Sequence, residues 1–229
     1  MAKGKKFVIS LGGSIAFPEG MNIAFLKNFY FFIKKEIKKR NKFIIVAGGG
    51  AITRKYQEAA SKITQVSNED KDWLGIHATR LNAHLVRTIL KRNANPIVFD
   101  NRYKITNFGR YSIIVASGWR PGWSTDYVAV QIAADFKIKS VINLSKAAYV
   151  YTADFQKYPE AKPIEKISWN SYLDLIPQKW IPGLHVPVDP VAAKLAKRKN
   201  IKVIVVGGDD LNNLKNIMRG GKFEGTVLE

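Results

Sequence analysis

Short apolar runs that end in glycine and lead into helical stretches constrain the fold of this chain more than any other feature. The run at 6–11 is followed by Gly12 and Gly13, and the run at 43–47 is followed by three glycines at 48–50. Apolar runs of this length, bounded by turn residues, are typical of buried strands, and the segments between them carry helical periodicity. The repeated order of strand, turn and helix predicts a parallel α/β sheet.

The same alternation continues along the chain. Further strands are expected at 96–99, 112–116, 140–144 and 201–206, and helices at 22–39, 72–92 and 125–136. This order favours an α/β fold, a three-layer αβα sandwich with a mainly parallel open sheet, and 229 residues suit one domain. In open α/β sheets, ligands bind beyond the carboxyl ends of the strands, which is where the glycine turns fall. The stretch 153–188, which contains five prolines, is the most irregular, and we interpret it as a lid or a subdomain edge.

Composition and charge exclude several classes of function. Cysteine is absent, which rules out disulfides, thiolate nucleophiles and cysteine-based zinc sites, and the three histidines stand at no recognisable metal spacing. No apolar run approaches the ~20 residues of a membrane span, and the apolar stretch at the N-terminus is shorter than that of a signal peptide, so we expect a soluble, cytoplasmic protein. The net charge of +19 would attract nucleic acid, nucleotides, anionic lipid or phosphate. Because many of these cations stand near helix ends, where they complement the helix dipole, we favour a solvated surface over a dedicated nucleic-acid surface.

The glycine turns are also suited to binding anions. Glycine between a strand and a helix lets backbone N–H groups converge on a phosphate, although tight turns also use glycine for steric reasons alone. After the three glycines at 48–50, Arg54 stands about one helical turn in, where its guanidinium could bind the same phosphate. Neither turn continues as a Walker A motif or a GxGxxG fingerprint, which excludes ordinary P-loop and Rossmann sites. In a third turn, at 118–126, Ser124 and Thr125 offer hydroxyls at a predicted helix start, where capping explains them equally well.

Seven segments stand in one order over nearly the whole chain. They are ISLGGS at 9–14, VAGGGAITRKY at 46–56, DWLGIHATRLNA at 72–83, SGWRPGWSTDYVA at 117–129, VINLSKAAYVYTAD at 141–154, VDPVAAKLA at 188–196 and GTVLE at 225–229. In this order and spacing they resemble the amino acid kinase superfamily, most closely the archaeal-type uridylate kinases. The resemblance implies a nucleoside monophosphate kinase of pyrimidine biosynthesis, which transfers the γ-phosphoryl group of ATP to UMP and gives UDP and ADP. It also implies Mg²⁺ bound through the nucleotide phosphates and a homo-oligomer, typically a hexamer.

The resemblance also assigns roles to individual positions. The residues implied for UMP are Gly48, Gly49, Arg54, Asp72, Gly75, Thr79, Gly118 and Thr125, with Asn82 supporting the same helix. The residues implied for ATP are Gly12, Gly13, Ser14, Ser145, Lys146, Tyr151 and Asp154. The implied catalytic residues are Gly12, Ser14, Asp189 and Lys194, and no residue is assigned as a direct metal ligand. The acceptor side would occupy a lobe from 1 to about 130, and the ATP side the lobe 131–229.

One departure from the family pattern concerns the catalytic cation. Ser10 stands where bacterial uridylate kinases carry a lysine, which archaeal-type members commonly lack. Another cation must then serve, and the candidates are Lys5, Lys6 and Lys194. Asp189 and Pro190 also match the N-cap and first position of a helix. A catalytic role and a capping role therefore explain Asp189 equally well.

The second departure lies in the ATP-side loop. Ala148 and Tyr149 stand where the family has an acidic residue and a glycine. If the backbone there needs positive φ, tyrosine costs roughly 1–2 kcal/mol of strain; otherwise the turn is rebuilt. Lys146 would compensate by reaching a phosphate directly.

Other functions stay open on the sequence alone. Isopentenyl phosphate kinases carry a histidine in the loop after the triple glycine, and 51–54 has none, which favours UMP as acceptor over the substrates of these and of carbamate, acetylglutamate and aspartate kinases. A catalytically altered kinase fold that acts as an RNA- or nucleotide-binding regulatory module is the alternative, and an anion-storage protein is a third. The enzyme prediction depends on two glycine-lined anion sites that face each other. It fails if they point apart or if Tyr149 fills the donor side.

Overall fold

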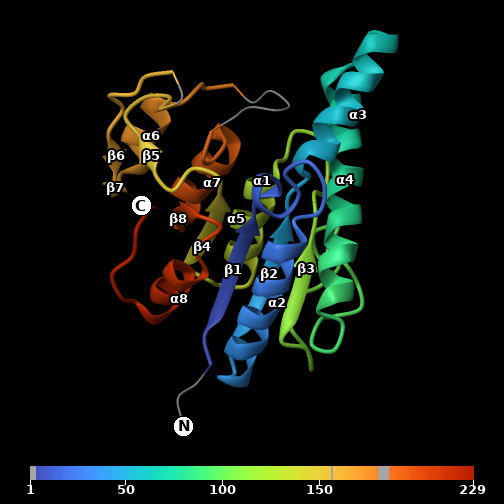
Figure 1. Ribbon diagram of the computed structural model, residues 1–229, viewed down its shortest axis with the longest axis vertical. Helices are drawn as coiled ribbons and strands as arrows, with labels where there is room; N and C mark the ends of the chain where they lie inside the picture. The colour runs from blue at the N-terminus through green and yellow to red at the C-terminus, as the bar shows by residue number, and fades with distance from the viewer. Residues whose placement is uncertain (1–3, 156, 180–185) are drawn as a thin grey trace.

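A seven-stranded sheet runs through the centre of the molecule (Figure 1). The computed structural model describes residues 4–155, 157–179 and 186–229. The strand order is β3-β2-β1-β4-β8-β9-β7, and neighbouring strands pair in parallel except β8 and β9, which are antiparallel. The predicted mainly parallel open sheet is therefore confirmed.

The elements follow the predicted order. The strands of the sheet are β1 (Lys6–Leu11), β2 (Lys42–Ala47), β3 (Ile113–Ala116), β4 (Ser140–Ser145), β7 (Lys166–Ile167), β8 (Lys202–Gly207) and β9 (Thr226–Leu228). The helices are α1 (Gly13–Ala16), α2 (Ile23–Lys38), α3 (Gly50–Ile63), α4 (Asn68–Ile89), α5 (Thr125–Asp135), α6 (Trp169–Leu175), α7 (Pro190–Lys199) and α8 (Leu211–Arg219). Two short strands, β5 (Val150–Tyr151) and β6 (Pro163–Ile164), form a separate antiparallel hairpin.

The expected strand at 96–99 is wrong. This segment is linked to β3 only by isolated bridges, from Ala94 to Ile113 and from Phe99 to Ala116. Pro96 has no N–H to donate, and the Asn95 side chain accepts a hydrogen bond from the backbone N–H of Ile97 at 3.0 Å. A local turn of this kind competes with strand pairing.

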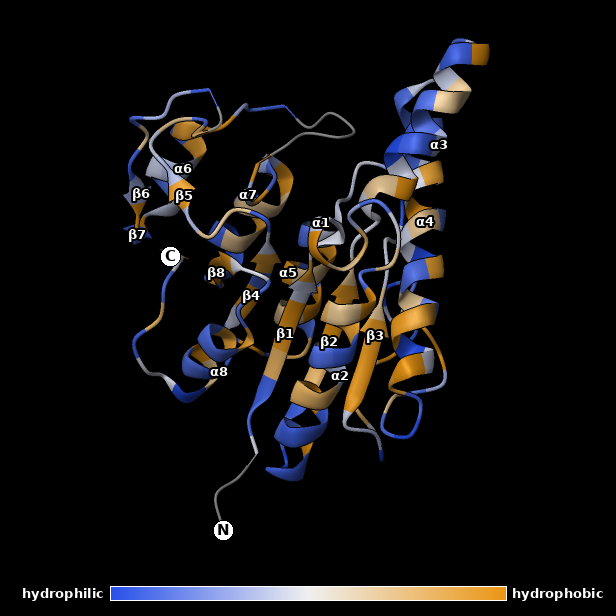
Figure 2. Ribbon diagram, viewed as in Figure 1, coloured by the Kyte–Doolittle hydropathy of each residue, from blue (hydrophilic) through white to orange (hydrophobic). Residues whose placement is uncertain are grey.

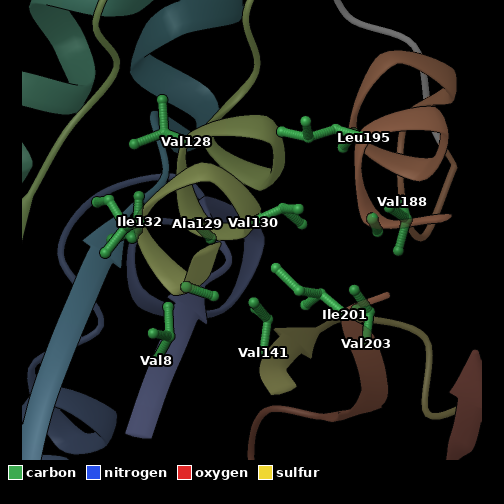
Figure 3. Packing of buried hydrophobic residues seen from close by; sticks show 14 of the residues in the cluster. Val8, Val128, Ala129, Val130, Ile132, Val141, Val188, Leu195, Ile201 and Val203 are labelled. Carbon is green, nitrogen blue, oxygen red and sulfur yellow. The ribbon is translucent and has the colours of Figure 1, made fainter. Parts of the chain in front are cut away.

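Helices cover both faces of the sheet, because successive strand residues point to opposite sides. Val8, Val141 and Val203 belong to one buried cluster together with residues of α5 and α7, as Figure 3 shows. The neighbouring Ile9 and Ile142 belong to a second cluster with residues of α2, α4 and α8. Hydrophobic colours accordingly line the sheet and the inner sides of the helices (Figure 2). The three-layer αβα arrangement is confirmed.

The carboxyl ends of the parallel strands lie at one end of the molecule, at the top of the sheet in Figure 1. Helices α3 and α4 pack together and extend beyond the sheet at that end (Figure 1). The stretch 153–188 holds β6, α6 and the edge strand β7, which agrees with a subdomain edge. Its role as a lid stays a prediction. Residues 156 and 180–185 of this stretch lie outside the described part. None of the helices described is long and apolar enough to cross a membrane.

Candidate active site

The two predicted glycine turns touch each other at the carboxyl ends of β1 and β2. A Cβ atom added to Gly13 would lie 2.1 Å from the backbone nitrogen of Gly50, and one added to Gly48 would lie 2.5 Å from the nitrogen of Gly13. No side chain fits at these two positions, because backbone lies against backbone and neither strand can move out of the sheet. The turns therefore converge, as the sequence analysis required.

The triple-glycine turn leads directly into α3. Gly49 is the N-cap residue of this helix and supplies no side-chain cap, and Gly50 has a φ of +69°, a conformation that favours glycine. The backbone N–H of Ala51 donates to the carbonyl of Phe17 at 3.0 Å, which ties the start of α3 to the end of α1. Arg54 is exposed in the first helical turn, and its pairing with an anion at this helix start stays a prediction.

One face of α4 holds the acceptor side together. The side-chain amide of Asn82 donates to the carbonyls of Gly48 at 2.8 Å and Gly49 at 3.0 Å. The hydroxyl of Thr79 accepts from the backbone N–H of Gly118 at 2.8 Å and donates to the carbonyl of Ile76 at 2.7 Å. Asn82 and Thr79 are buried, so these bonds lie out of water and fix the loops before any ligand binds.

Asp72 and Gly75 continue the same helix face. Residues 72, 75, 79 and 82 recur every three or four positions, so they project from one side of α4. The carboxylate of Asp72 accepts from the backbone N–H of Gly122 at 2.7 Å, and a Cβ atom at Gly75 would lie 3.3 Å from the Thr53 methyl group. The structure thus brings together six of the predicted acceptor residues around α4 and gives Asp72 a structural partner in the loop 118–124; the six are Gly48, Gly49, Asp72, Gly75, Thr79 and Gly118.

On the donor side, three strand ends surround the Gly12 turn. The backbone N–H of Gly12 donates to the carbonyl of Leu144 at 2.9 Å, and that of Gly208 donates to the carbonyl of Ser145 at 3.0 Å. A Cβ atom at Gly208 would lie 2.8 Å from the Ile15 side chain, next to the exposed Ser14. The predicted donor residues at 12–14 and 145 therefore share one location with the end of β8.

The glycine pair at 207–208 was not among the predicted site residues. It follows the apolar run of β8 as Gly12 and Gly13 follow β1, so the pattern of strand and glycine turn would have found it. Asp210, two residues later, caps α8 by accepting from the backbone N–H groups of Asn212 at 2.8 Å and Asn213 at 3.1 Å.

The altered ATP-side loop is rebuilt without backbone strain. Tyr149 is not among the described non-glycine residues with positive φ. Burial raises the pKa of the Tyr149 hydroxyl, and Glu224 and Glu165 add to the rise, while a backbone hydrogen bond with Gly225 opposes it. The hydroxyl is thus directed toward the loop before β9, and Ala148 lies beside Gly207, 3.6 Å from a Cβ placed there.

The remaining donor candidates are more exposed. The ring of Tyr151 packs against Phe155 with centroids 4.7 Å apart and meets Tyr149 edge to face at 6.2 Å. Lys146 and Asp154 are exposed, and the carboxylate of Asp154 lies 3.9 Å from the amine of Lys157.

Two of the three candidates for the catalytic cation are wrong. Lys5 and Lys6 lie at the amino end of β1, where the Lys5 amine donates to the carbonyl of Met218 at 3.4 Å and the Lys6 amine stands 6.0 Å from the Phe108 ring. The strand runs about 3.3 Å per residue, so its full length separates them from Gly12. Lys194 is exposed, and its amine donates to the carbonyl of Gln178 at 3.4 Å.

A pair of carboxylates joins the two sides below the glycine turns. Asp126 accepts from the hydroxyl of Ser10 at 2.9 Å, and the buried Asp189 accepts from the hydroxyl of Ser124. Burial raises the pKa of Asp126 to about 7, and the charge of Asp189 adds to the rise. Burial also raises the pKa of Asp189, against hydrogen bonds from Ser124 and from the start of α7.

Asp189 is the predicted cap of α7. Its carboxylate accepts from the backbone N–H groups of Val191 at 2.8 Å and Ala192 at 3.0 Å, and Pro190 opens the helix. Asp126 belongs to the third predicted turn but was not among the predicted site residues, because its position in the first turn of α5 is explained by the helix dipole alone. Its contact with Ser10, 116 positions away, follows from the packing of α5 on the sheet.

Comparisons with known proteins point in one direction. The model of the amino acid kinase family matches residues 5–207. The uridylate kinase of Staphylothermus marinus is 34% identical over 200 residues, which cover 87% of this chain and 89% of that protein. The uridylate kinase of Pyrococcus abyssi is 33% identical over 229 residues, which cover 98% and 99%. The crystal structure of uridylate kinase from Archaeoglobus fulgidus superposes with a TM-score of 0.79 at 28% identity, over 98% of this chain and 100% of that one.

Proposed function

The chain belongs to the amino acid kinase family, and from this premise we propose that it phosphorylates UMP with ATP and gives UDP and ADP. The observation that carries the proposal is the contact between the Gly13 and Gly48–Gly50 turns. Two anion-binding turns in contact put a donor and an acceptor phosphate next to each other.

The acceptor side would bind the UMP phosphate at the start of α3. The helix N-terminus and the guanidinium of Arg54 supply positive charge there, and the glycine turn lets the phosphate approach the backbone. We assign Gly75, Gly118 and Thr125 to the same acceptor region, and the second carboxylate oxygen of Asp72 would accept from the ribose hydroxyls.

The donor side would bind ATP along the ends of β1, β4 and β8. The backbone at 12–14 faces the β- and γ-phosphates, the loop at 145–146 adds the Ser145 hydroxyl and the Lys146 amine, and Tyr151 and Asp154 border the adenosine. Mg²⁺, carried by the phosphates of ATP, supplies charge neutralisation. Asp126 and Asp189 contact residues on both sides of this junction, and their bonds to Ser10, Ser124 and α7 suit them to positioning the turns.

Transfer needs no covalent enzyme intermediate. An oxygen of the UMP phosphate attacks the γ-phosphorus, the bond from that phosphorus to the β-bridging oxygen breaks, and ADP leaves with the electron pair. The acceptor oxygen is already anionic at neutral pH and needs no general base. The work of the protein is alignment and charge neutralisation, to which Arg54, Lys146 and the helix start of α3 contribute.

We also propose a homo-oligomer, with the hexamer as the expected form. Helices α3 and α4, which pack together, expose large apolar side chains: Tyr56 is 58% exposed, Ile63 is 86% exposed and Leu81 is 67% exposed. Large apolar side chains that a helix pair leaves exposed favour a subunit contact. The lobes at 1 to about 130 and 131–229 share one continuous sheet through the pairing of β1 with β4, which supports one domain per subunit.

The test is an acceptor screen with the purified chain and MgATP. UMP, CMP, isopentenyl phosphate, carbamate and acetylglutamate are compared by the ADP formed, with product identity checked by chromatography. We expect UMP to give the highest kcat/KM and UDP as the product. Faster turnover of another acceptor, or no turnover of any, contradicts the proposal.

A further inference from the structure

Cations line the end of the sheet that lies opposite the glycine turns. We call this set the basic edge; its members are Lys6, Lys42, Lys91, Arg92, Arg110 and Lys139. Lys6 and Lys42 are register partners at the starts of β1 and β2, and Lys139 immediately precedes β4. Figure 2 shows hydrophilic colours gathered at this lower end of the molecule.

The basic edge contains a cavity at the start of β3. The cavity has a volume of about 500 Å³ and is lined by Lys91, Arg92, Ala94, Pro96, Arg110 and Tyr111. Its three cations are exposed and make no ion pair within the described part of the chain. The guanidinium of Arg110 lies over the ring of Tyr111, 5.2 Å from its centroid, and donates to its hydroxyl at 3.2 Å. The cavity therefore offers positive charge beside a flat aromatic surface.

Three acidic side chains near this end pair with cations outside the basic edge. Glu36 pairs with Lys39, Asp135 with Arg102, and Glu229 with Lys166 and Lys202. Lys6 and Lys42 contact the ring of Phe108, at 6.0 Å and 5.2 Å from its centroid, which holds the two amines side by side without removing their charge. None of the ion pairs in the described part of the chain includes a member of the basic edge.

The shape of the basic edge selects its partner. Its cations follow the starts of β3, β2, β1 and β4, which are neighbours in the sheet and lie about 4.8 Å apart, so the row is on the order of 14 Å long. A single phosphate or nucleotide would occupy only part of this length, whereas a chain of phosphates matches it. The Arg110–Tyr111 pair adds a platform on which a base can stack, which a lipid headgroup would not use.

We propose that the basic edge binds single-stranded RNA, with the phosphate backbone along the row of cations and a base stacked in the cavity on Tyr111. Affinity then rests on counterion release by the cations and on stacking, and little on base identity. This activity is separate from phosphoryl transfer, because the basic edge and the glycine turns lie at opposite ends of the strands.

The test is binding of a fluorescein-labelled 20-nucleotide oligouridylate, followed by anisotropy across a salt series. Excess UMP and ADP are present, so that nucleotide sites do not contribute. We expect the K91A/R92A/R110A variant to bind at least 10-fold more weakly than the parent. For this variant, the slope of log Kd against the logarithm of the salt concentration should be smaller by about 2. Three cations are removed, and each phosphate contact to a single strand contributes about 0.7 to that slope.

The control variant K27A/K62A/K162A removes the same charge from exposed lysines elsewhere and should bind within twofold of the parent. Tyr111→Leu should weaken binding at least fivefold, and Tyr111→Phe should stay within twofold. Thermal unfolding and UDP formation are measured on each variant, so a folding defect or a failure of the proposed kinase activity is recognised separately.

Three outcomes overturn the proposal. Equal weakening by both triple variants means that net charge alone attracts the RNA. No effect of Tyr111→Leu means that no base stacks in the cavity. Loss of binding to vesicles with 30% phosphatidylglycerol in the K91A/R92A/R110A variant, with RNA binding unchanged, identifies the surface as a membrane contact.

Discussion

The proposed acceptor side and the proposed donor side of the candidate site are built differently. On the acceptor side, buried side chains from one face of α4 bond directly to the backbone of the loops: Asn82 to Gly48 and Gly49, and Thr79 to Gly118. On the donor side, loops meet through backbone bonds such as that from Gly208 to Ser145, and the altered segment is covered by packed rings of Tyr149, Tyr151 and Phe155.

This difference in construction predicts which side tolerates amino-acid substitutions. Buried side-chain bonds to backbone require one residue type, because any other leaves a carbonyl or N–H without its partner. Ring packing depends on shape and area, and the loop at 148–149 keeps an unstrained backbone with residues that the family pattern does not have. We therefore expect point changes to lower activity more on the acceptor side, and four changes test this comparison.

Gly13→Ala should have the largest effect, because it acts where the two sides touch. The added methyl group would lie 2.1 Å from the nitrogen of Gly50, so the turns must separate. A displacement of about 1 Å can cost about 100-fold in rate, and we expect kcat/KM for UMP to fall at least that far. Steady-state kinetics measure it. Gly20→Ala, where nothing lies within 4 Å of the new atom, is the matched control and should behave as the parent.

Arg54→Ala should weaken the acceptor side alone. A charge-assisted hydrogen bond to phosphate contributes about 1.5–3 kcal/mol, so kcat/KM for UMP should fall about 30-fold while KM for ATP stays within twofold. Lys55→Ala removes the neighbouring charge and serves as the control. A rise in KM for ATP as large as that for UMP would contradict the assignment of this turn to the acceptor.

Asp126→Asn tests the junction between the two sides by its effect on the pH dependence of the free energy of unfolding. The folded state holds the Asp126 proton more tightly than the unfolded state, so ionisation of this group as pH rises from about 4 to about 7 costs stability. The full rise in pKa corresponds to about 4 kcal/mol; because the side chain of Asp126 is partly exposed, we expect a smaller cost, on the order of 1 kcal/mol.

Urea unfolding at pH 5 and pH 8 measures this effect. The difference between the free energy of unfolding of Asp126→Asn and that of the parent should shift in favour of the variant as pH rises. The same comparison with Asp174→Asn, an exposed carboxylate on α6, should show no such gain. An equal difference at both pH values would mean that the proton on Asp126 is not coupled to folding.

Tyr151→Ala should have the smallest effect, about fivefold in KM for ATP, because it removes one ring from the packed set on the donor side. Tyr151→Phe keeps the ring and should match the parent. A loss above 30-fold in kcat/KM for the alanine variant would reverse the comparison and make the donor side the more demanding one.

The sequence predicted most of the architecture but only part of the site. Alternating apolar runs and helical stretches were sufficient for β1, β2, β3, β4 and β8 and for α2, α4 and α5, since those patterns reflect burial on two faces, whereas the short strands β7 and β9 were not predicted. The strand predicted at 96–99 was wrong because only Val98 and Phe99 of this apolar run are buried, while Pro96 and Asn95 form a local turn in place of regular strand pairing. Lys5 and Lys6 were wrong as catalytic cations because position along a strand, and not nearness in sequence, decides which end of the sheet a side chain occupies.

By itself, the sequence determined the fold class, the glycine turns at the ends of β1 and β2, and the capping of α7 by Asp189, because each depends on local backbone chemistry and on the period of burial. Only the tertiary structure decided that the turns touch, that Asp126 meets Ser10 and that Tyr149 turns toward Gly225. It also assembled the basic edge, whose cations are spread from residue 6 to residue 139. Those contacts join residues far apart in the chain, and the stacking of strands and helices that brings them together leaves no short-range pattern in the sequence.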